Sequence, residues 1–234
     1  MILADDPNAR RLRAITQNDH AHFSAELISL WRHPILVDHP RRSEILFAIR
    51  EHDNGWREAD SAPSCDPEGR PHDFLSLPET RRQELWQRGV RRFLTEHPWS
   101  SALILEHARH LHRHREDAVY SEILLEWQEM QAALLEDVGL GEEQMRTDYA
   151  WLELGDALSL ALSSRWHRRI ELHGFVADVE GDLLRLDPFP LAGATTFRIP
   201  CRWIPDRPYQ GDADLAVELA MARWEEATVR VVAL

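Results

Sequence analysis

Residues 169–179 read RIELHGFVADV, and they mark the point at which the periodicity of the chain changes. Apolar and polar residues alternate here, which is typical of half-buried β-strands. Three later stretches also favour strands: GDLLRLDPF (181–189), TTFRIPCRWI (195–204) and ATVRVVAL (227–234). A helix is expected from Asp212 to about Trp224. Residues 168–234 therefore predict a small antiparallel β/α appendage.

Upstream of this point, the apolar residues recur at helical spacing. Thr16 followed by Asp19 indicates a capped helix start. Helices are expected over six ranges: 17–32, 44–53, 79–96, 100–115, 116–137 and 142–166. Residues 57–78 are rich in Pro, Asp, Ser and Gly and predict a long loop, of the kind that often forms a lid or a pocket wall. The chain is therefore expected to be mainly α, with a helical domain over 1–167 and the appendage over 168–234 packed on it.

The bulk composition narrows the class of protein. With 234 residues, 44% of them hydrophobic and 29% charged, the chain is typical of a globular protein. No apolar run approaches the roughly 18 residues that a membrane span needs, and MILADDPNARRLR lacks the order of a signal peptide. A cytoplasmic location without membrane association is expected. The net charge of −13 argues against general affinity for nucleic acid.

A histidine and an aspartate end the second expected helix, in EHDNGW (51–56). The C-terminal end of a helix carries partial negative charge, which favours His52 there and disfavours the carboxylate of Asp53. Either the turn simply uses polar residues, or a cation lies against both side chains. Adjacent helical residues point about 100° apart, so this pair reaches one cation only in a groove between helices.

Further candidates lie on other expected helices. His20 falls in the first turn of its helix, where the positive end favours the neutral, metal-binding imidazole; the alternative is an exposed polar residue. Asp156 lies inside the apolar stretch WLELGDALSLALS (151–163), where a buried carboxylate must be paired or ligate a metal. His107 aligns with apolar neighbours, as a core histidine or a ligand would. His110 is ambiguous, and His112 is interpreted as solvated.

The order His20, His52-Asp53, Asp156, each on a different expected helix, resembles the H…HD…D pattern of the HD-domain superfamily of metal-dependent phosphohydrolases. Five segments are also similar to the bacterial domain-of-unknown-function family numbered 3891: QNDHAHFSAELISLW (17–31), HDNGW (52–56), GRPHDF (69–74), LILEHARHL (103–111) and LGDALSLAL (154–162). The HD resemblance implies an HD-like helical bundle. Asp156 departs from it by following the HD pair at a longer interval than in the most compact members.

The resemblance also implies a metal and its ligands. Its metal ligands would be His20, His52, Asp53, Asp156 and, with a second ion, His107. One or two divalent transition metals (Mn, Fe, Co, Ni or Zn) suit these mixed nitrogen and oxygen donors. Asp53 and His107 are then the implied catalytic residues, because Asp53 would bridge two ions and His107 would help to hold the second.

The implied reaction is hydrolysis of a small phosphorylated molecule or a nucleotide. Arg57 or Arg70 would clamp the phosphate in a bidentate manner. Trp56 would stack on a base or form a pocket wall, although a core tryptophan is an equal alternative. Asp60, on the 57–78 loop, would shape the substrate side.

Two other functions remain open from the sequence. HD-like proteins with two irons oxidise substrates with O₂, which would require a complete second set of ligands. Alternatively, the chain is a non-enzymatic helical protein whose polar core pairs histidine with aspartate for association or regulation. A homodimer formed through residues 168–234 is also considered.

Overall fold

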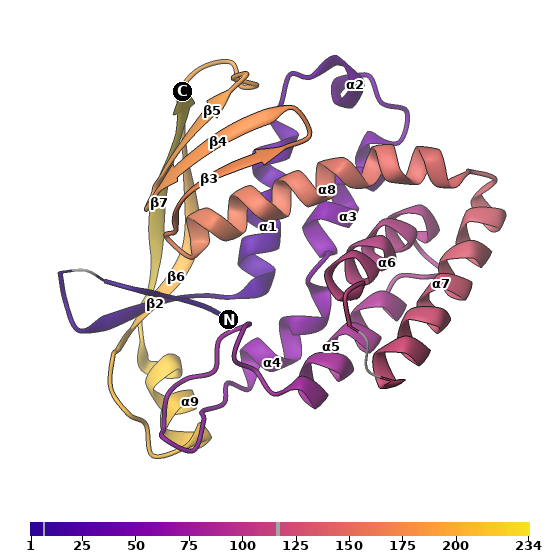
Figure 1. Ribbon diagram of the computed structural model, residues 1–234. Helices are drawn as coiled ribbons and strands as arrows, with labels where there is room; N and C mark the ends of the chain where they lie inside the picture. The colour runs from indigo at the N-terminus through magenta and orange to yellow at the C-terminus, as the bar shows by residue number, and fades with distance from the viewer. Residues whose placement is uncertain (7, 116–117) are drawn as a thin grey trace.

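The computed structural model describes residues 1–6, 8–115 and 118–234, and its central feature is a curled seven-stranded sheet with helices packed against it (Figure 1). The strand order is β1-β2-β6-β7-β5-β4-β3. The strands are β1 (Ile2–Asp5), β2 (Arg11–Ile15), β3 (His167–Leu172), β4 (Phe175–Glu180), β5 (Leu183–Asp187), β6 (Thr195–Pro205) and β7 (Trp224–Ala233). Neighbouring strands are antiparallel except β5 and β7, which run parallel.

The β3–β4 hairpin shows how the local sequence sets the geometry. His173 and Gly174 form its two-residue turn, with φ angles of 50° and 81°. Two positive φ values in succession match the type I′ turn, whose twist suits a hairpin. The alternating sequence RIELHGFVADV therefore forms two paired strands, with Leu172 opposite Phe175.

The helices lie mainly between β2 and β3 along the chain. They are α1 (Gln17–Ser29), α2 (Pro34–Val37), α3 (Arg42–Glu51), the 3₁₀ turn η1 (Asn54–Trp56), α4 (Arg57–Ser61), α5 (Glu79–Arg91), α6 (Pro98–His112), α7 (Ala118–Val138), α8 (Glu142–Ser163) and α9 (Asp212–Met221). Thr16 caps α1 as expected, because its hydroxyl oxygen accepts from the Asp19 N–H at 2.9 Å. The expected start of a helix at 116 lies outside the described residues.

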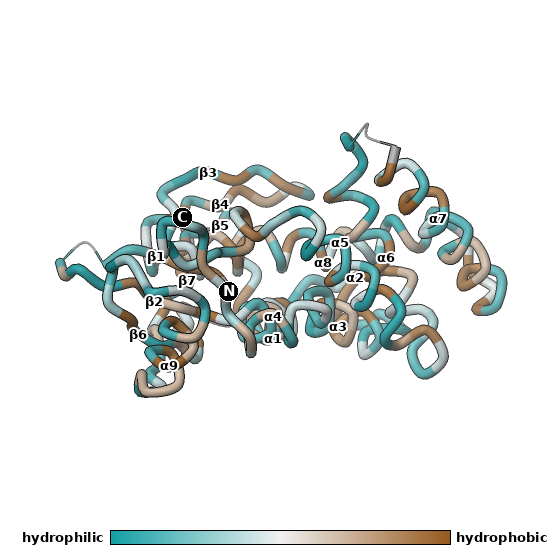
Figure 2. The backbone as a smooth tube through the Cα atoms, turned by 90° about the horizontal axis from the view of Figure 1, so that it is seen from below, coloured by the Kyte–Doolittle hydropathy of each residue, from teal (hydrophilic) through white to brown (hydrophobic). Residues whose placement is uncertain are grey.

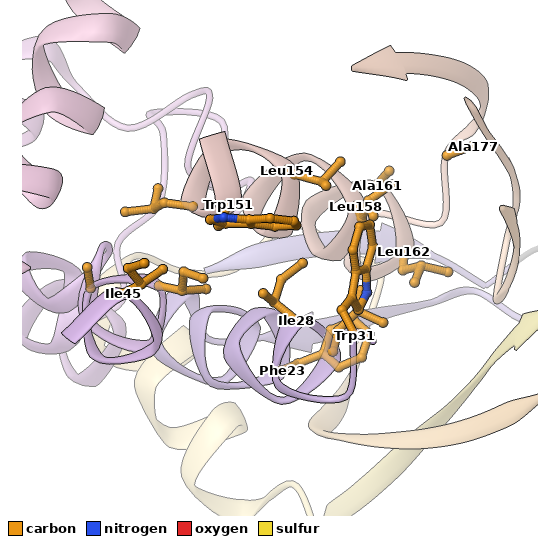
Figure 3. Close-up of a cluster of buried hydrophobic side chains, with 14 of the residues drawn as sticks. Phe23, Ile28, Trp31, Ile45, Trp151, Leu154, Leu158, Ala161, Leu162 and Ala177 are labelled. Carbon is orange, nitrogen blue, oxygen red and sulfur yellow. The ribbon is translucent and has the colours of Figure 1, made fainter. Parts of the chain in front are cut away.

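The main hydrophobic core lies between α1, α3, α8 and the inner face of the sheet. Figure 3 shows Ile28 of α1 pointing toward α8, and the Trp31 ring beside Leu162; Leu158 of α8 belongs to the same core. Sheet residues such as Ala177 complete this core. Burying these side chains fixes α1, α3 and α8 side by side, and these three helices carry the candidate site.

The expectation of a mainly α, HD-like helical bundle is wrong, because the protein has a mixed α/β fold. The strands β1 and β2 were not expected from the sequence, yet they join the sheet through the pairing of β2 with β6. The sheet is also not purely antiparallel. The two N-terminal strands are only four and five residues long, and their partner strand lies near the other end of the sequence, so the local pattern gives little indication of them.

The sheet thus unites segments from both ends of the sequence. Figure 2 shows the sheet and α9 at one end of the molecule and α7 at the other. The division into folding units at residue 167 stays a prediction. None of the helices in the described parts of the chain is long and apolar enough to cross a bilayer.

Candidate metal centre

His20 stands in the first turn of α1, and its side chain is 1% exposed. Its Nδ1 lies 2.9 Å from the hydroxyl oxygen of Ser159 on α8. The Ser159 hydroxyl itself donates to the carbonyl oxygen of Asp156 at 3.1 Å. The hydroxyl proton is therefore already used, so His20 Nδ1 is the donor and its Nε2 carries the lone pair.

His52 and Asp53 follow the last residue of α3, and both are buried. The Nδ1 of His52 lies 2.7 Å from the carbonyl oxygen of Ile49. A carbonyl can only accept, so Nδ1 carries a proton, and in the neutral ring Nε2 carries the lone pair. Such anchoring of the second ring nitrogen is the usual arrangement of metal-binding histidines.

The turn after Asp53 is held directly against α5. The Asn54 side-chain amide donates to the carbonyl oxygens of Glu51 and Gly89, at 2.8 and 3.1 Å. A Cβ on Gly55 would lie 2.1 Å from the carbonyl oxygen of Leu85, so only glycine fits at this contact. The close packing of Asn54 and Gly55 against α5 therefore sets the position of His52 and Asp53.

Asp156 reaches the site from α8 through a close approach of two helices. A Cβ on Gly155 would lie 2.6 Å from Ser24 Oγ and 2.9 Å from Ile28 Cγ1, both on α1. The absence of a side chain at Gly155 thus allows α8 to lie close to α1, and places the neighbouring Asp156 beside His20.

The four side chains converge on one point. Oδ1 of Asp156 lies 3.1 Å from Nε2 of His20 and 3.3 Å from Nε2 of His52. Oδ2 of Asp53 lies 3.5 and 3.4 Å from the same two nitrogens. Ligand atoms bound at about 2.1 Å to one ion are separated by about 3.0 to 3.4 Å. His20, His52 and Asp156 form a group whose donor atoms all lie within 4.8 Å of one another, and this group can bind a metal.

Two buried nitrogen atoms show that the site suits a cation. Among the residues that the structure describes, Nε2 of His20 and Nε2 of His52 have no hydrogen-bond partner, although both face carboxylates at close range. A buried polar atom without a partner is costly. The two lone pairs and the two carboxylates would all be satisfied by one divalent ion, so these residues fit a metal.

The charges of the site also call for a cation. Burial lowers the pKa of His52, but the carboxylates of Asp53 and Asp156 outweigh it and hold that pKa well above its usual value. Burial raises the pKa of Asp156, but the close imidazoles of His20 and His52 and the positive charge of His52 hold that pKa well below its usual value. Two buried carboxylates need positive charge between them, which either protonated imidazole or a metal ion supplies.

His107 of α6 lies at the edge of this group. Its Nε2 is 3.8 Å from Oδ2 of Asp156, and its ring centroid is 5.0 Å from that of His52. Its Nδ1 lies 3.3 Å from the Tyr149 hydroxyl. Burial lowers the pKa of His107 to about 4, so the imidazole is neutral at pH 7. His110 instead contacts Glu153 at 3.1 Å, away from this group.

The group forms the floor of a pocket of about 340 Å³. His20, Asp53, His107 and Asp156 all line it. The rest of the lining combines aromatic, apolar and charged side chains. It consists of Gln17, Trp56, Phe74, Leu75, Glu79, Arg82, Trp86, Leu111, His112, Arg115 and Leu160. This volume lies at the lower end of the range for small-molecule sites.

The structure brings one of the four expected substrate residues to this pocket. Trp56 is 5% exposed and lines it. Arg57 instead donates to Asn18 and Glu51. Asp60 is buried and accepts from the Gln17 backbone N–H at 2.7 Å. Arg70 is paired with Asp66 and lines a different surface hollow.

Several residues in or beside the pocket were not expected from the sequence. Ser159 anchors His20, and its only sequence signal is its place three residues after Asp156 on one helix. Arg82 and Arg115 lie far apart in the sequence, within runs of other arginines. His112, interpreted as solvated, is only 8% exposed, because its ring stacks on Tyr120 and meets Trp86 edge-on.

The fold and this site together define a mixed α/β protein with a buried histidine–aspartate group that can bind a metal. The family model described as "Protein of unknown function (DUF3891)" matches residues 1–206, and the chain belongs to this family. The matched range contains every residue of the group and of its pocket. No curated protein and no solved structure matches the chain.

Proposed function

We propose that the protein is a metal-dependent phosphohydrolase that acts on a small phosphorylated molecule. The observation that carries the proposal is the pair of unpartnered Nε2 atoms, on His20 and His52, that face two carboxylates at the floor of a pocket. From the HD resemblance the proposal keeps only the order of these residues along the chain.

The donor set favours one class of metal. His20, His52, Asp53 and Asp156 offer nitrogen and carboxylate oxygen without a thiolate, which suits Mn²⁺, Fe²⁺, Co²⁺, Ni²⁺ or Zn²⁺. A second ion would draw on His107, whose Nε2 is 3.8 Å from Asp156. Iron as the dominant metal would redirect the proposal toward oxygen chemistry.

The reaction would add water across a P–O bond, so that an alcohol and inorganic phosphate leave. Bound in such a site, a divalent ion lowers the pKa of a water ligand and polarises a phosphoryl oxygen. The protein's own part is to hold the imidazoles in one orientation through Ser159 and Ile49. The walls formed by Trp56 and Trp86 limit the water that reaches the floor.

The test is phosphate release by protein that has been stripped with a chelator and reloaded with a single metal. Wild type with Mn²⁺ should release phosphate from 4-nitrophenyl phosphate or a nucleoside monophosphate, and Asp53→Ala should lose this activity while its circular dichroism is unchanged. His110→Ala is the matched control, because this histidine lies on α6 but contacts Glu153. Equal activity of Asp53→Ala and wild type would contradict the proposal.

A further inference from the structure

The pocket above the histidine–aspartate group has a second polar region, which we call the arginine rim and define as Glu79, Arg82 and Arg115. Both guanidinium groups donate to Oε2 of Glu79. The Tyr120 hydroxyl donates to Oε1 of the same carboxylate. The three rim residues come from the start of α5 and from the segment after α6, and all three line the pocket.

The rim and the floor are separated by a row of ring contacts. From the floor, His107 meets Trp86 at 5.9 Å between ring centroids, and Trp86 meets His112 at 5.5 Å. His112 then stacks on Tyr120, whose hydroxyl reaches Glu79. Along α6, His107 and His112 are five residues apart, or about 7.5 Å. The rim therefore lies at the opposite end of the pocket from the metal-binding group.

The wall between these two ends is apolar. Trp86 is 7% exposed and Trp56 is 5% exposed, so both present ring surface to the pocket from a buried position. Leu75 and Leu111 line the same pocket and are 63% and 51% exposed. When a ligand covers a large apolar side chain at a pocket mouth, the removal of that surface from water favours binding.

The charges of the two ends differ. At the floor, a divalent ion would neutralise the two carboxylates of Asp53 and Asp156. At the rim, the two guanidinium groups face one carboxylate among the described residues, which leaves one positive charge in excess within that part of the chain, and Arg82 also donates to the Leu75 carbonyl oxygen at 3.3 Å. The two oxygens of Glu79 cannot satisfy all ten N–H donors of two guanidinium groups. The rim thus retains charge and donors for an anionic group, within a chain whose net charge is −13.

From these observations we infer that the ligand of this pocket carries two anionic groups joined by a short apolar or aromatic body. One group is a phosphoryl group at the floor, and the other is a carboxylate or second phosphate bound by Arg82 and Arg115. This inference rests on the proposed function for the identity of the floor group. The arginine rim takes the role that the sequence analysis gave to Arg57 and Arg70.

Binding of two phosphonates, which cannot be hydrolysed at phosphorus, tests the inference. Benzylphosphonate and 4-carboxybenzylphosphonate differ only in the carboxylate, and isothermal titration calorimetry on Mn²⁺-loaded protein gives both affinities. The carboxylate should tighten binding about tenfold in wild type, as expected for a charge-assisted hydrogen bond. Arg115→Gln and Arg82→Gln should abolish this preference and leave the affinity for benzylphosphonate within about twofold of wild type.

Arg113→Gln is the matched control, because Arg113 is a neighbouring exposed arginine that does not line this pocket. It should retain the preference, and circular dichroism should show that all variants are folded. Equal affinity of wild type for both probes, no binding of either probe, or equal loss in Arg113→Gln would each overturn the inference. A carboxylate preference without hydrolysis of any ester would contradict the proposed function alone, and hydrolysis without the preference would contradict the inference alone.

Discussion

Ser159 and the carbonyl oxygen of Ile49 decide which nitrogen of each central histidine faces the carboxylates. Both bonds are made by Nδ1, at 2.9 Å for His20 and 2.7 Å for His52. Each ring thereby directs its Nε2 lone pair to the same point between Asp53 and Asp156. At the scale of residues, the candidate centre depends on these hydrogen bonds of Nδ1 as much as on the Nε2 and carboxylate atoms that would bind the metal.

Ser159→Ala should weaken metal binding without unfolding the protein. Loss of the hydroxyl frees His20 to rotate and to change tautomer, and outer-shell changes of this kind cost about 10-fold to 100-fold in metal affinity. Competition with a chromophoric chelator measures this affinity. Ser163→Ala is the control, because Ser163 is a buried serine on the same helix whose hydroxyl makes no hydrogen bond. An unchanged affinity in Ser159→Ala would show that the serine does not orient His20.

Asp53 and Asp156 stand out in the sequence because each carboxylate is chemically out of place in its local context, and His20 and His52 because they share the H…HD…D order with them. An aspartate inside an apolar helix, or at a helix C-terminus, needs a partner, and that need is visible without a structure. Ser159 has no such signal, because a serine in a helix is unremarkable until its neighbour across the interface is known. The sequence does not single out Arg82 and Arg115 either, because all 27 basic residues of this chain are arginine and local context does not distinguish these two.

Among the elements, the approach of α8 to α1 positions the site. Gly155 leaves room for Ser24 and Ile28 of α1, and it directly precedes Asp156. The contact is too close for any Cβ, because the nearest atoms would lie at 2.6 and 2.9 Å. The spacing of two helices is therefore coupled to the spacing of His20 and Asp156.

Gly155→Ala should lower both stability and metal affinity. The added methyl group forces α8 from α1, at a cost of about 1 to 3 kcal/mol in the free energy of unfolding. Urea unfolding and the chelator competition measure the two effects. Gly193→Ala is the control, because no atom lies within 4 Å of the position of its Cβ. Unchanged stability and metal affinity in Gly155→Ala would show that the close approach of α8 to α1 does not position the site.

The rim links α5 to the segment after α6, and its stability should depend on pH. Burial raises the pKa of Glu79, but hydrogen bonds from Tyr120, Arg115 and Arg82 lower it to about 2. The pKa in the unfolded chain is the ordinary 4.5. The stabilisation is therefore complete above pH 4.5 and is lost as the pH falls toward 2.

Urea unfolding of wild type and Glu79→Gln between pH 7 and pH 3 tests this linkage. Wild type should be the more stable at pH 7, and the difference should shrink below pH 4.5. Glu142→Gln, which removes an exposed pair with Arg146, should show little difference at any pH. A difference between wild type and Glu79→Gln that does not change with pH would contradict the assignment of the lowered pKa.

The elements themselves were only partly predictable. Most expected helices exist, although the one expected over 79–96 ends at Arg91. Strand structure over 169–179 and the later strands were also expected, since period-two alternation is a local signal. The strands β1 and β2 were missed because they are short and gain their stability from pairing with β6.

At the scale of the whole molecule, one buried arginine joins three distant parts of the chain. Arg13 of β2 is 2% exposed, and its guanidinium donates to Asp182 at 2.7 Å in the β4–β5 turn. It also donates to the carbonyl oxygens of Leu162 and Ser163 at 3.0 and 3.1 Å, at the end of α8. The Leu162 carbonyl also accepts from the Arg165 N–H at 3.1 Å. Through these bonds Arg13 ties the N-terminal hairpin to both α8 and the far half of the sheet.

Arg13→Met should destabilise the protein by roughly 2 to 4 kcal/mol, because it removes the guanidinium donor from the Ser163 carbonyl, while Leu162 and Asp182 keep Arg165 as a partner. The free energy of unfolding in urea measures the loss. Arg198→Met on β6 removes an exposed ion pair with Glu226 of β7, and it should cost no more than about 1 kcal/mol. Similar values for the two variants would show that Arg13 does not hold these segments together.

The histidine–aspartate group is the central claim, and metal content tests it most directly. Inductively coupled plasma mass spectrometry would be applied to wild type, to His52→Ala/Asp53→Ala and to His110→Ala, all expressed and purified alike in metal-replete medium. About one equivalent of a divalent transition metal is expected in wild type and His110→Ala, and none in the double variant. Absence of metal from all three folded proteins, or equal content in the double variant, would contradict the claim.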